Sequence, residues 1–179
     1  IHLLCGTFDG IKLITSLREL LDEDMIPDKK IKEFREQTYT CQKNYEGVSE
    51  FKRILNYFIS YKYRENLIDT IAAELGYEFD VSDFYVSVEK LKEMQISGNI
   101  IGSHSVSHPV MSKLSNIEQA NEINDSFSFL NDFSKRGIKT YCHPYGGFHS
   151  FNDDTLAALN SNDVDFSFNV EPRDICNND

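Results

Sequence analysis

From about residue 80 onward, stretches with the pattern of a strand alternate with stretches with the pattern of a helix. Short apolar runs predict three strands, over 99–102, 138–142 and 164–170. Helices are expected between them, with start signals at Ser87, at the capping box 115-SNIE-118, and at Asn152 or Asp153. Strands that alternate with helices predict a parallel sheet. We therefore expect an α/β fold, with these three strands in one sheet and 1–5 as a candidate fourth.

The first 80 residues have a different texture. Apolar side chains recur at helical spacing over 11–21, 51–59 and 67–75, and Gly76 follows where a helix would end. The charged segment 28–36 is open to two interpretations, an exposed helix or a mobile link. We expect 1–80 to be a mostly helical insertion or subdomain beside an α/β region over 81–179, the two making one structural domain.

Charge and hydropathy exclude several classes of partner. The chain carries 29 acidic and 18 basic side chains, a net charge of -11. Nucleic acid and anionic membrane surfaces favour clustered Lys and Arg, so neither is expected as a partner, whereas a neutral sugar is compatible. No apolar run approaches the roughly 20 residues that a membrane helix needs. A cytoplasmic location is favoured weakly over association with the cell envelope, because no signal-peptide pattern opens the chain.

The four cysteines are widely spaced: Cys5, Cys41, Cys142 and Cys176. They form no CxxC pair, which argues against a zinc ribbon, and a disulfide framework is unusual at this chain length. Free thiols, mostly buried, are the expectation, in a reducing compartment.

The segment 99-NIIGSHSVSHPVMSKLS-115 holds two histidines four residues apart. A helix is a poor interpretation, because glycine and serines surround them and Pro109 follows. His104 is instead expected at the carboxyl end of a strand, with His108 in the turn beyond it. Ligands collect at that end of α/β sheets, and imidazoles bind zinc. The alternative is a pair of loop histidines bonded only to backbone.

A second motif, 141-YCHPYGGFHS-150, follows the strand expected over 138–142. Proline ends strand pairing, and the glycines allow a sharp turn or a close approach to a ligand. Tyr145 could present its hydroxyl or its ring face to a sugar, or the segment could be an ordinary tight turn. Both motifs follow neighbouring parallel strands, so we expect His104 and His108 to point toward a common position beside Tyr145.

GSHSVSHP together with Pro144-Tyr145-Gly146 resembles motifs of the polysaccharide deacetylases, carbohydrate esterases with the NodB homology domain. The likeness covers about 85–170. It implies a distorted (β/α) barrel, of which this chain would carry part of the parallel sheet, and removal of N- or O-acetyl groups from a sugar or polysaccharide. It further implies a divalent metal, commonly zinc, held by His104 and His108, and a substrate groove lined by Pro144, Tyr145 and Gly146.

The family's first motif, TFDDG, supplies a catalytic base and a third metal ligand, but this chain offers only 7-TFDG-10. We interpret Asp9 as a coincidence and expect the true first motif upstream of Ile1, with 1–80 inserted after it. The late acid histidine is also missing, so base and acid are expected outside this chain. Cys142 stands where many members have an arginine, and His143 and His149 are interpreted as loop histidines.

Three functions remain open on the sequence. The first is a metal-dependent carbohydrate deacetylase, present here as an incomplete catalytic domain that binds metal poorly and is catalytically silent by itself. The second is a non-catalytic sugar-binding or assembly module that has lost the base. The third is a structural helical protein with incidental histidines. The glycan and the oligomeric state are not indicated by the sequence.

Overall fold

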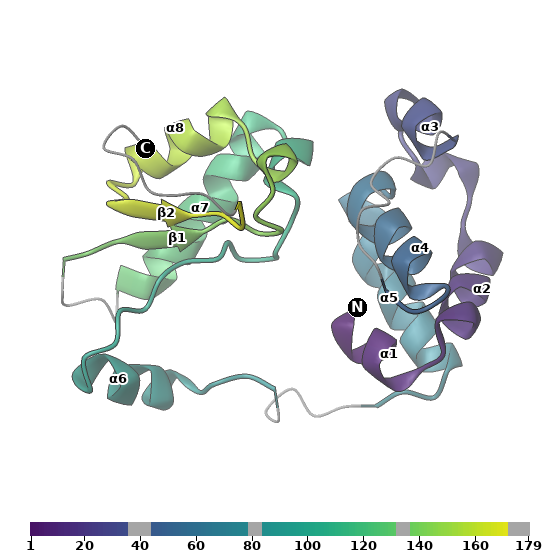
Figure 1. Ribbon diagram of the computed structural model, residues 1–179, viewed down its shortest axis with the longest axis horizontal. Coiled ribbons are helices and arrows are strands. Elements are labelled where there is room, and N and C mark those ends of the chain that lie inside the picture. Colours follow the sequence, from purple (N-terminus) through teal and green to yellow (C-terminus); the bar gives the residue numbers. More distant parts are fainter. Residues whose placement is uncertain (36–43, 79–83, 132–136, 172–179) are drawn as a thin grey trace. The chain divides into compact units, whose positions relative to one another are not determined.

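The structure is a computed structural model that describes residues 1–35, 44–78, 84–131 and 137–171 (Figure 1). The chain forms two compact units, Ile1–Asp80 and Val81–Asp179, which we call unit 1 and unit 2. Each unit is described by itself below.

Unit 1 is built from helices over its described part. They are α1 (His2–Thr7), α2 (Gly10–Leu20), the 3-10 turn η1 (Glu23–Met25), α3 (Asp28–Arg35), α4 (Val48–Arg53), the π-helical turn η2 (Ile54–Phe58) and α5 (Tyr61–Glu74). The helices expected from apolar spacing are therefore found, and α5 ends at Glu74, two residues before Gly76, which has a positive φ of 65°. The charged segment after residue 28 is a helix as far as Arg35, and residue 36 lies outside the described residues.

The core of unit 1 comes from apolar side chains of α1, α2, α4, η2 and α5, together with Ile59 directly after η2. Its buried members are Leu4, Leu13, Ile14, Leu17, Phe51, Ile54, Leu55, Ile59, Leu67 and Ile71. Burying a side chain of this size contributes about 2 kcal/mol. The N-terminal ends of α2 and α4 meet backbone to backbone, because a Cβ on Gly10 would lie 2.7 Å from the backbone nitrogen of Val48. Glycine at residue 10 is what allows this close approach.

The candidate fourth strand over 1–5 was a wrong prediction, since residues His2–Thr7 form α1. Four side chains explain the helix: Leu4 is buried, and Ile1, Cys5 and Phe8 pack partly buried against the same core. Spacings of three and four residues place all of them on one side of a helix, whereas a strand would send them to opposite faces. A run this short reads equally well as either element until its packing partners are known.

Unit 2 contains a parallel sheet with helices between its strands (Figure 1). The elements in chain order are α6 (Val88–Ile96), the 3-10 turn η4 (Met111–Lys113), α7 (Asn116–Asn131), β1 (Thr140–Cys142), the 3-10 turn η5 (Phe148–Ser150), α8 (Asp153–Ser161) and β2 (Phe166–Phe168). Strands β1 and β2 pair in parallel, with Tyr141 opposite Ser167. On the other side of β1, Ser103 forms one isolated parallel bridge to Tyr141. The α/β class is therefore confirmed, and the barrel stays a prediction.

The strands are shorter than the sequence indicated. The expected strand 99–102 is absent, and only Ser103 pairs, through Ser103 N to Thr140 O and Cys142 N to Ser103 O, both at 2.8 Å. Asn99 is used to close α6, because its backbone and side-chain nitrogens both donate to the carbonyl of Met94. Within the expected strand 164–170 only Phe166–Phe168 pairs, and its apolar side chains are exposed among the described residues.

Helices α7 and α8 pack on one face of the sheet and form the core of unit 2. Its buried side chains are Met111, Ile123, Phe127, Leu130, Tyr141, Ala158 and Leu159. The expected start signals are found. Ser87 caps α6, Asn152 forms a capping box with Thr155, and Glu118 accepts from both the backbone nitrogen and Oγ of Ser115.

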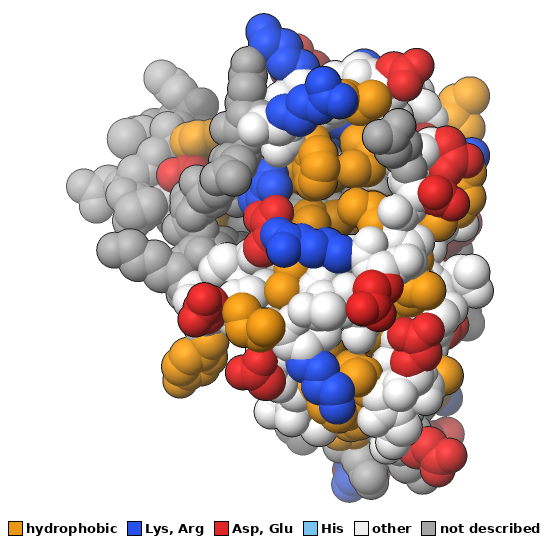
Figure 2. Space-filling view, turned by 90° about the vertical axis from the view of Figure 1, so that its right-hand side faces the viewer, with side chains coloured by type: hydrophobic (Ala, Val, Ile, Leu, Met, Phe, Trp, Pro, Cys, Tyr) orange, Lys and Arg blue, Asp and Glu red, His pale blue; other side chains and the backbone are white. Residues whose placement is uncertain are grey.

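Three further expectations concern the surface charge, a membrane span and the cysteines. On the face drawn in Figure 2, acidic and basic side chains are mixed, with hydrophobic side chains visible between them. None of the helices in the described residues is long and apolar enough to cross a membrane. Cys5 and Cys142 carry free thiols, half-buried and exposed respectively, whereas Cys41 and Cys176 lie outside the described residues.

Candidate functional site

The two histidines lie in the loop that directly follows Ser103, the residue that forms a bridge to β1. Residues 104–110 form neither helix nor strand, and the loop ends at the buried Val110 and Met111, which anchor it to unit 2. The rings of His104 and His108 are in contact, with centroids 4.7 Å apart and planes inclined by 67°. The loop therefore brings the two imidazoles side by side without a helix.

The imidazole of His104 is held from one side by β1. Its Nδ1 lies 2.8 Å from the carbonyl oxygen of Cys142. A carbonyl oxygen only accepts hydrogen bonds, so Nδ1 carries the proton and the lone pair of a neutral ring resides on Nε2. Histidines that bind metals are commonly oriented in this way by a hydrogen bond at the other ring nitrogen. The arrangement leaves the lone pair of His104 Nε2 available to coordinate a metal ion.

His108 connects the histidine pair to the turn after β1. Its ring centroid lies 4.9 Å from that of Tyr145, with planes inclined by 57°. Both residues have left-handed backbone conformations, with φ of 53° for His108 and 63° for Tyr145, and Ser105 has a φ of 64°. Non-glycine residues in this region cost about 1–2 kcal/mol each, and such residues gather at functional sites.

The turn 144–146 is packed against the end of β2. Pro144 and Gly146 are buried and Tyr145 is half-buried. The carbonyl of Gly146 accepts from the backbone nitrogen of Val170 at 3.1 Å, and a Cβ on Gly146 would lie 2.6 Å from a methyl carbon of Val170. Of the three residues expected to contact substrate, the structure places Tyr145 against His108, and Tyr145 is the one that is not buried.

His143 is more enclosed than its interpretation as a loop histidine implied. Its side chain is 3% exposed, stacks on Phe151 with centroids 3.9 Å apart, and meets the ring of Tyr141 edge-on. Burial, with a smaller electrostatic contribution from the neighbouring His104, lowers the pKa of His143 to about 4. The ring is therefore neutral near pH 7. Nothing in the sequence signalled its burial, which depends on the position of Phe151.

Glu122 of α7 also belongs to the site, and the sequence analysis did not single it out. Its carboxylate accepts from the backbone nitrogens of Val106 and Ser107, the residues between the two histidines. A glutamate one helical turn after a capping box looks like an ordinary solvated helix residue. The contact forms because the histidine loop folds back onto α7, which the sequence does not indicate.

A metal would have two protein ligands here. Within the described ranges, no group of three or more His, Cys, Asp and Glu side chains is arranged to hold a metal ion. The adjacent rings of His104 and His108 suit zinc, which accepts neutral imidazole nitrogens, but protein zinc sites ordinarily have three or four protein ligands. The residues therefore fit part of a metal site.

Asp9 has a local structural role in unit 1. It is the N-cap of α2, and its Oδ1 accepts from the backbone nitrogens of Ile11 and Lys12 at 2.9 and 3.3 Å. Aspartate is among the preferred residues at this position, because its oxygen satisfies backbone donors that the helix leaves open. This contact accounts for Asp9 without a catalytic role.

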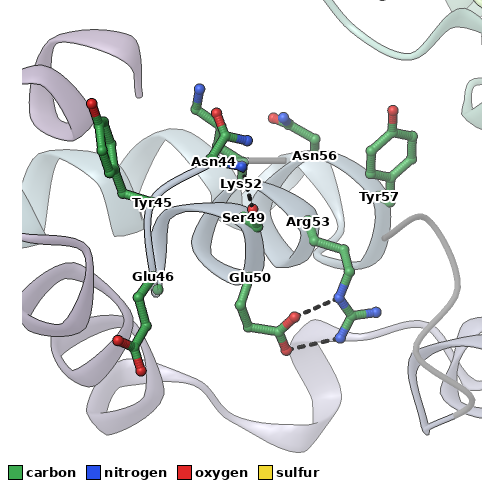
Figure 3. Close-up of a pocket in the computed structure, with 10 residues that line it drawn as sticks. Asn44, Tyr45, Glu46, Ser49, Glu50, Lys52, Arg53, Asn56 and Tyr57 are labelled. Atoms are coloured by element: carbon green, nitrogen blue, oxygen red, sulfur yellow. Dashed lines mark hydrogen bonds and ion pairs between the residues drawn. The ribbon is translucent and has the colours of Figure 1, made fainter. Parts of the chain in front are cut away.

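A cavity of about 240 Å³ in unit 1 lies beside α4 and η2 (Figure 3). It is lined by Asn44, Tyr45, Glu46, Gly47, Ser49, Glu50, Lys52, Arg53, Asn56 and Tyr57. The buried guanidinium of Arg53 donates to both carboxylate oxygens of Glu50 at 2.6 and 2.8 Å, and this hydrogen bonding lowers the pKa of Glu50. Arg53 also lies over the rings of Phe34 and Phe58. These contacts within unit 1 compensate the buried charge of Arg53, and we assign no ligand to the cavity.

Comparison with known families identifies one match. The model of the family described as polysaccharide deacetylase matches residues 57–167, which is more than half of the chain. The match includes the histidine loop and the turn 144–146, and it begins in unit 1, earlier than the start near residue 85 that the motifs indicated. No curated protein and no solved structure matches significantly. The chain belongs to the polysaccharide deacetylase family.

Proposed function

We propose that the protein removes acetyl groups from a carbohydrate by metal-dependent hydrolysis. Membership of the polysaccharide deacetylase family supports the acetylated carbohydrate as substrate class. The single observation that supports the metal is the contact between the rings of His104 and His108, with Nδ1 of His104 tied to the Cys142 carbonyl.

In this proposal each residue has a distinct task. His104 and His108 hold the ion through ring nitrogens, and the Cys142 carbonyl keeps the His104 ring oriented. Tyr145 lies against His108 and presents its hydroxyl or its ring face to the sugar. When bound, a divalent metal supplies Lewis-acid polarisation of the acetyl carbonyl and lowers the pKa of water.

Two groups are still needed for the complete reaction. Two neutral imidazoles leave the charge of a divalent ion uncompensated, so we infer that a carboxylate from outside the described residues completes the ligand set. A base must also take the proton from water, and an acid must protonate the leaving group. The described part of unit 2 offers no convincing base, and we expect hydrolysis by this chain alone to be very slow.

Metal binding is the first test. Zn²⁺ titrated into the full chain should bind weakly, with one ion per chain, and His104→Ala and His108→Ala should each abolish saturable binding. His149→Ala is the matched control, because His149 lies in η5 and is not one of the two rings in contact. Wild-type binding that survives both site substitutions would contradict the metal site.

The non-catalytic sugar-binding module is the second candidate, because Cys142 stands where family members commonly have an arginine. Acetate release from N- and O-acetylated oligosaccharides separates the two functions. Release that falls at least about 100-fold in His104→Ala supports hydrolysis. Saturable sugar binding with no acetate release, even with excess Zn²⁺, supports the binding module.

A further inference from the structure

The loop between the two histidines contains strained backbone and needs an external support. Ser105 and His108 both have positive φ angles, 64° and 53°. Each costs about 1–2 kcal/mol relative to ordinary backbone. Because the loop is not part of the sheet, other contacts must hold it in this conformation.

Glu122 provides the most direct of these contacts. One carboxylate oxygen accepts from the backbone nitrogens of Val106 and Ser107 at 2.8 and 2.9 Å, and the other accepts from Ser107 Oγ at 2.6 Å. Hydrogen bonds to an ionised group are roughly twice as strong as neutral ones. One side chain of α7 thus binds both residues in the middle of the His104–His108 loop.

A second contact comes from the same face of α7. Ser126, one turn after Glu122, lies with its Oγ 2.6 Å from Ser103 Oγ, and Ser103 Oγ accepts from the backbone nitrogen of Ser105. Ser105 Oγ in turn accepts from the backbone nitrogen of His108 at 3.1 Å. The Ser103 end of the loop is therefore linked to α7, the His108 end is bonded back to Ser105 within the loop, and Glu122 holds the middle.

We infer that Glu122 is a positioning residue that sets the spacing of His104 and His108 and thereby the metal affinity of the pair. It acts through its contacts with Val106 and Ser107 and is not one of the proposed ligands. The inference rests on the proposed function, in which these histidines hold a divalent metal. Residues that orient metal ligands typically change affinity about 10–100-fold when removed.

The test compares Glu122→Ala with Glu118→Ala. Glu118 lies one turn earlier on α7 and accepts hydrogen bonds from Ser115, so its removal weakens the same helix without touching the histidine loop. Two quantities are measured in the full chain. The first is the affinity for Co²⁺, followed by the visible absorption of the bound ion. The second, measured without metal, is the nuclear Overhauser effect between the imidazole rings of His104 and His108.

Glu122→Ala should lower Co²⁺ affinity about tenfold or more and remove the ring-to-ring effect, while Glu118→Ala preserves both. Equal losses in the two variants, or an unchanged ring-to-ring effect in Glu122→Ala, would overturn the inference. If the wild-type chain binds no Co²⁺, the proposed metal site fails, and the metal-free measurement still decides whether Glu122 positions the rings.

Discussion

Nδ1 of His104 donates to the carbonyl oxygen of Cys142 across 2.8 Å, which joins the histidine loop to the end of the central strand β1. This contact predicts the tautomer of the neutral ring. Long-range ¹⁵N–¹H correlation spectra at alkaline pH should show the proton of His104 on Nδ1 and an unprotonated Nε2. The urea-unfolded chain, in which the carbonyl is no longer held nearby, should lose this bias. A folded protein with the proton on Nε2 would contradict the contact.

Gly146→Ala should destabilise unit 2 by about 2–5 kcal/mol. The residue has a φ of 66°, which costs an alanine about 1–2 kcal/mol, and the new methyl would overlap the side chain and backbone of Val170, adding about 1–3 kcal/mol. Gly137→Ala is the matched control, because Gly137 has a φ of 70° but a Cβ there would meet no described atom within 4 Å.

Urea denaturation measures both free energies of unfolding. The excess cost of Gly146→Ala over Gly137→Ala isolates the contact with Val170. In the double variant with Val170→Ala, part of that excess should be recovered, because the two methyl groups of Val170 are removed. Equal costs for the two glycine substitutions would mean that the turn does not pack against β2 as described.

His143 should make the stability of unit 2 depend on pH. Burial lowers the pKa of His143 to about 4 in the folded state, from 6.5 in an unfolded chain. Between these values the unfolded state binds a proton that the folded state excludes, so the free energy of unfolding falls as the pH decreases from 6.5 to 4. The equilibrium constant for folding decreases by at most about tenfold for each pH unit of acidification, and this dependence is absent above pH 7.

His143→Phe tests the assignment, because phenylalanine retains the stacking on Phe151 and cannot be protonated. The difference between the urea unfolding free energies of wild type and variant should change over pH 4–6.5 and be constant above it. Carboxylates contribute equally to both curves and cancel in the difference. Parallel curves across the whole range would show that His143 does not titrate as a buried group.

Asp9 should prove to be a helix cap. Asp9→Ala should lower the free energy of unfolding of unit 1 by about 1 kcal/mol, whereas Asp9→Asn should change it little, because asparagine caps equally well. Neither substitution should alter metal binding by the histidine pair. Loss of acetate release or of metal binding in Asp9→Asn would instead identify 7-TFDG-10 as the family's first motif.

Several features could be predicted from the sequence because local groups produce them. Ser87, Glu118 and Asn152 satisfy backbone donors within a few residues of themselves, so the starts of α6, α7 and α8 follow from short segments. The histidine loop and the turn after β1 were also visible as motifs. Parallel pairing followed from the alternation of helix and strand patterns.

The tertiary structure decided the features that depend on residues far apart in the chain. The segment 1–5 is too short to indicate its own conformation. It belongs to α1 because its apolar side chains pack on the helical core of unit 1. The tautomer of His104 depends on Cys142, and the support of the histidine loop depends on Glu122. These contacts follow from the path of the backbone in three dimensions, because hydrogen bonds and burial act over distances of a few ångströms whatever the separation in sequence.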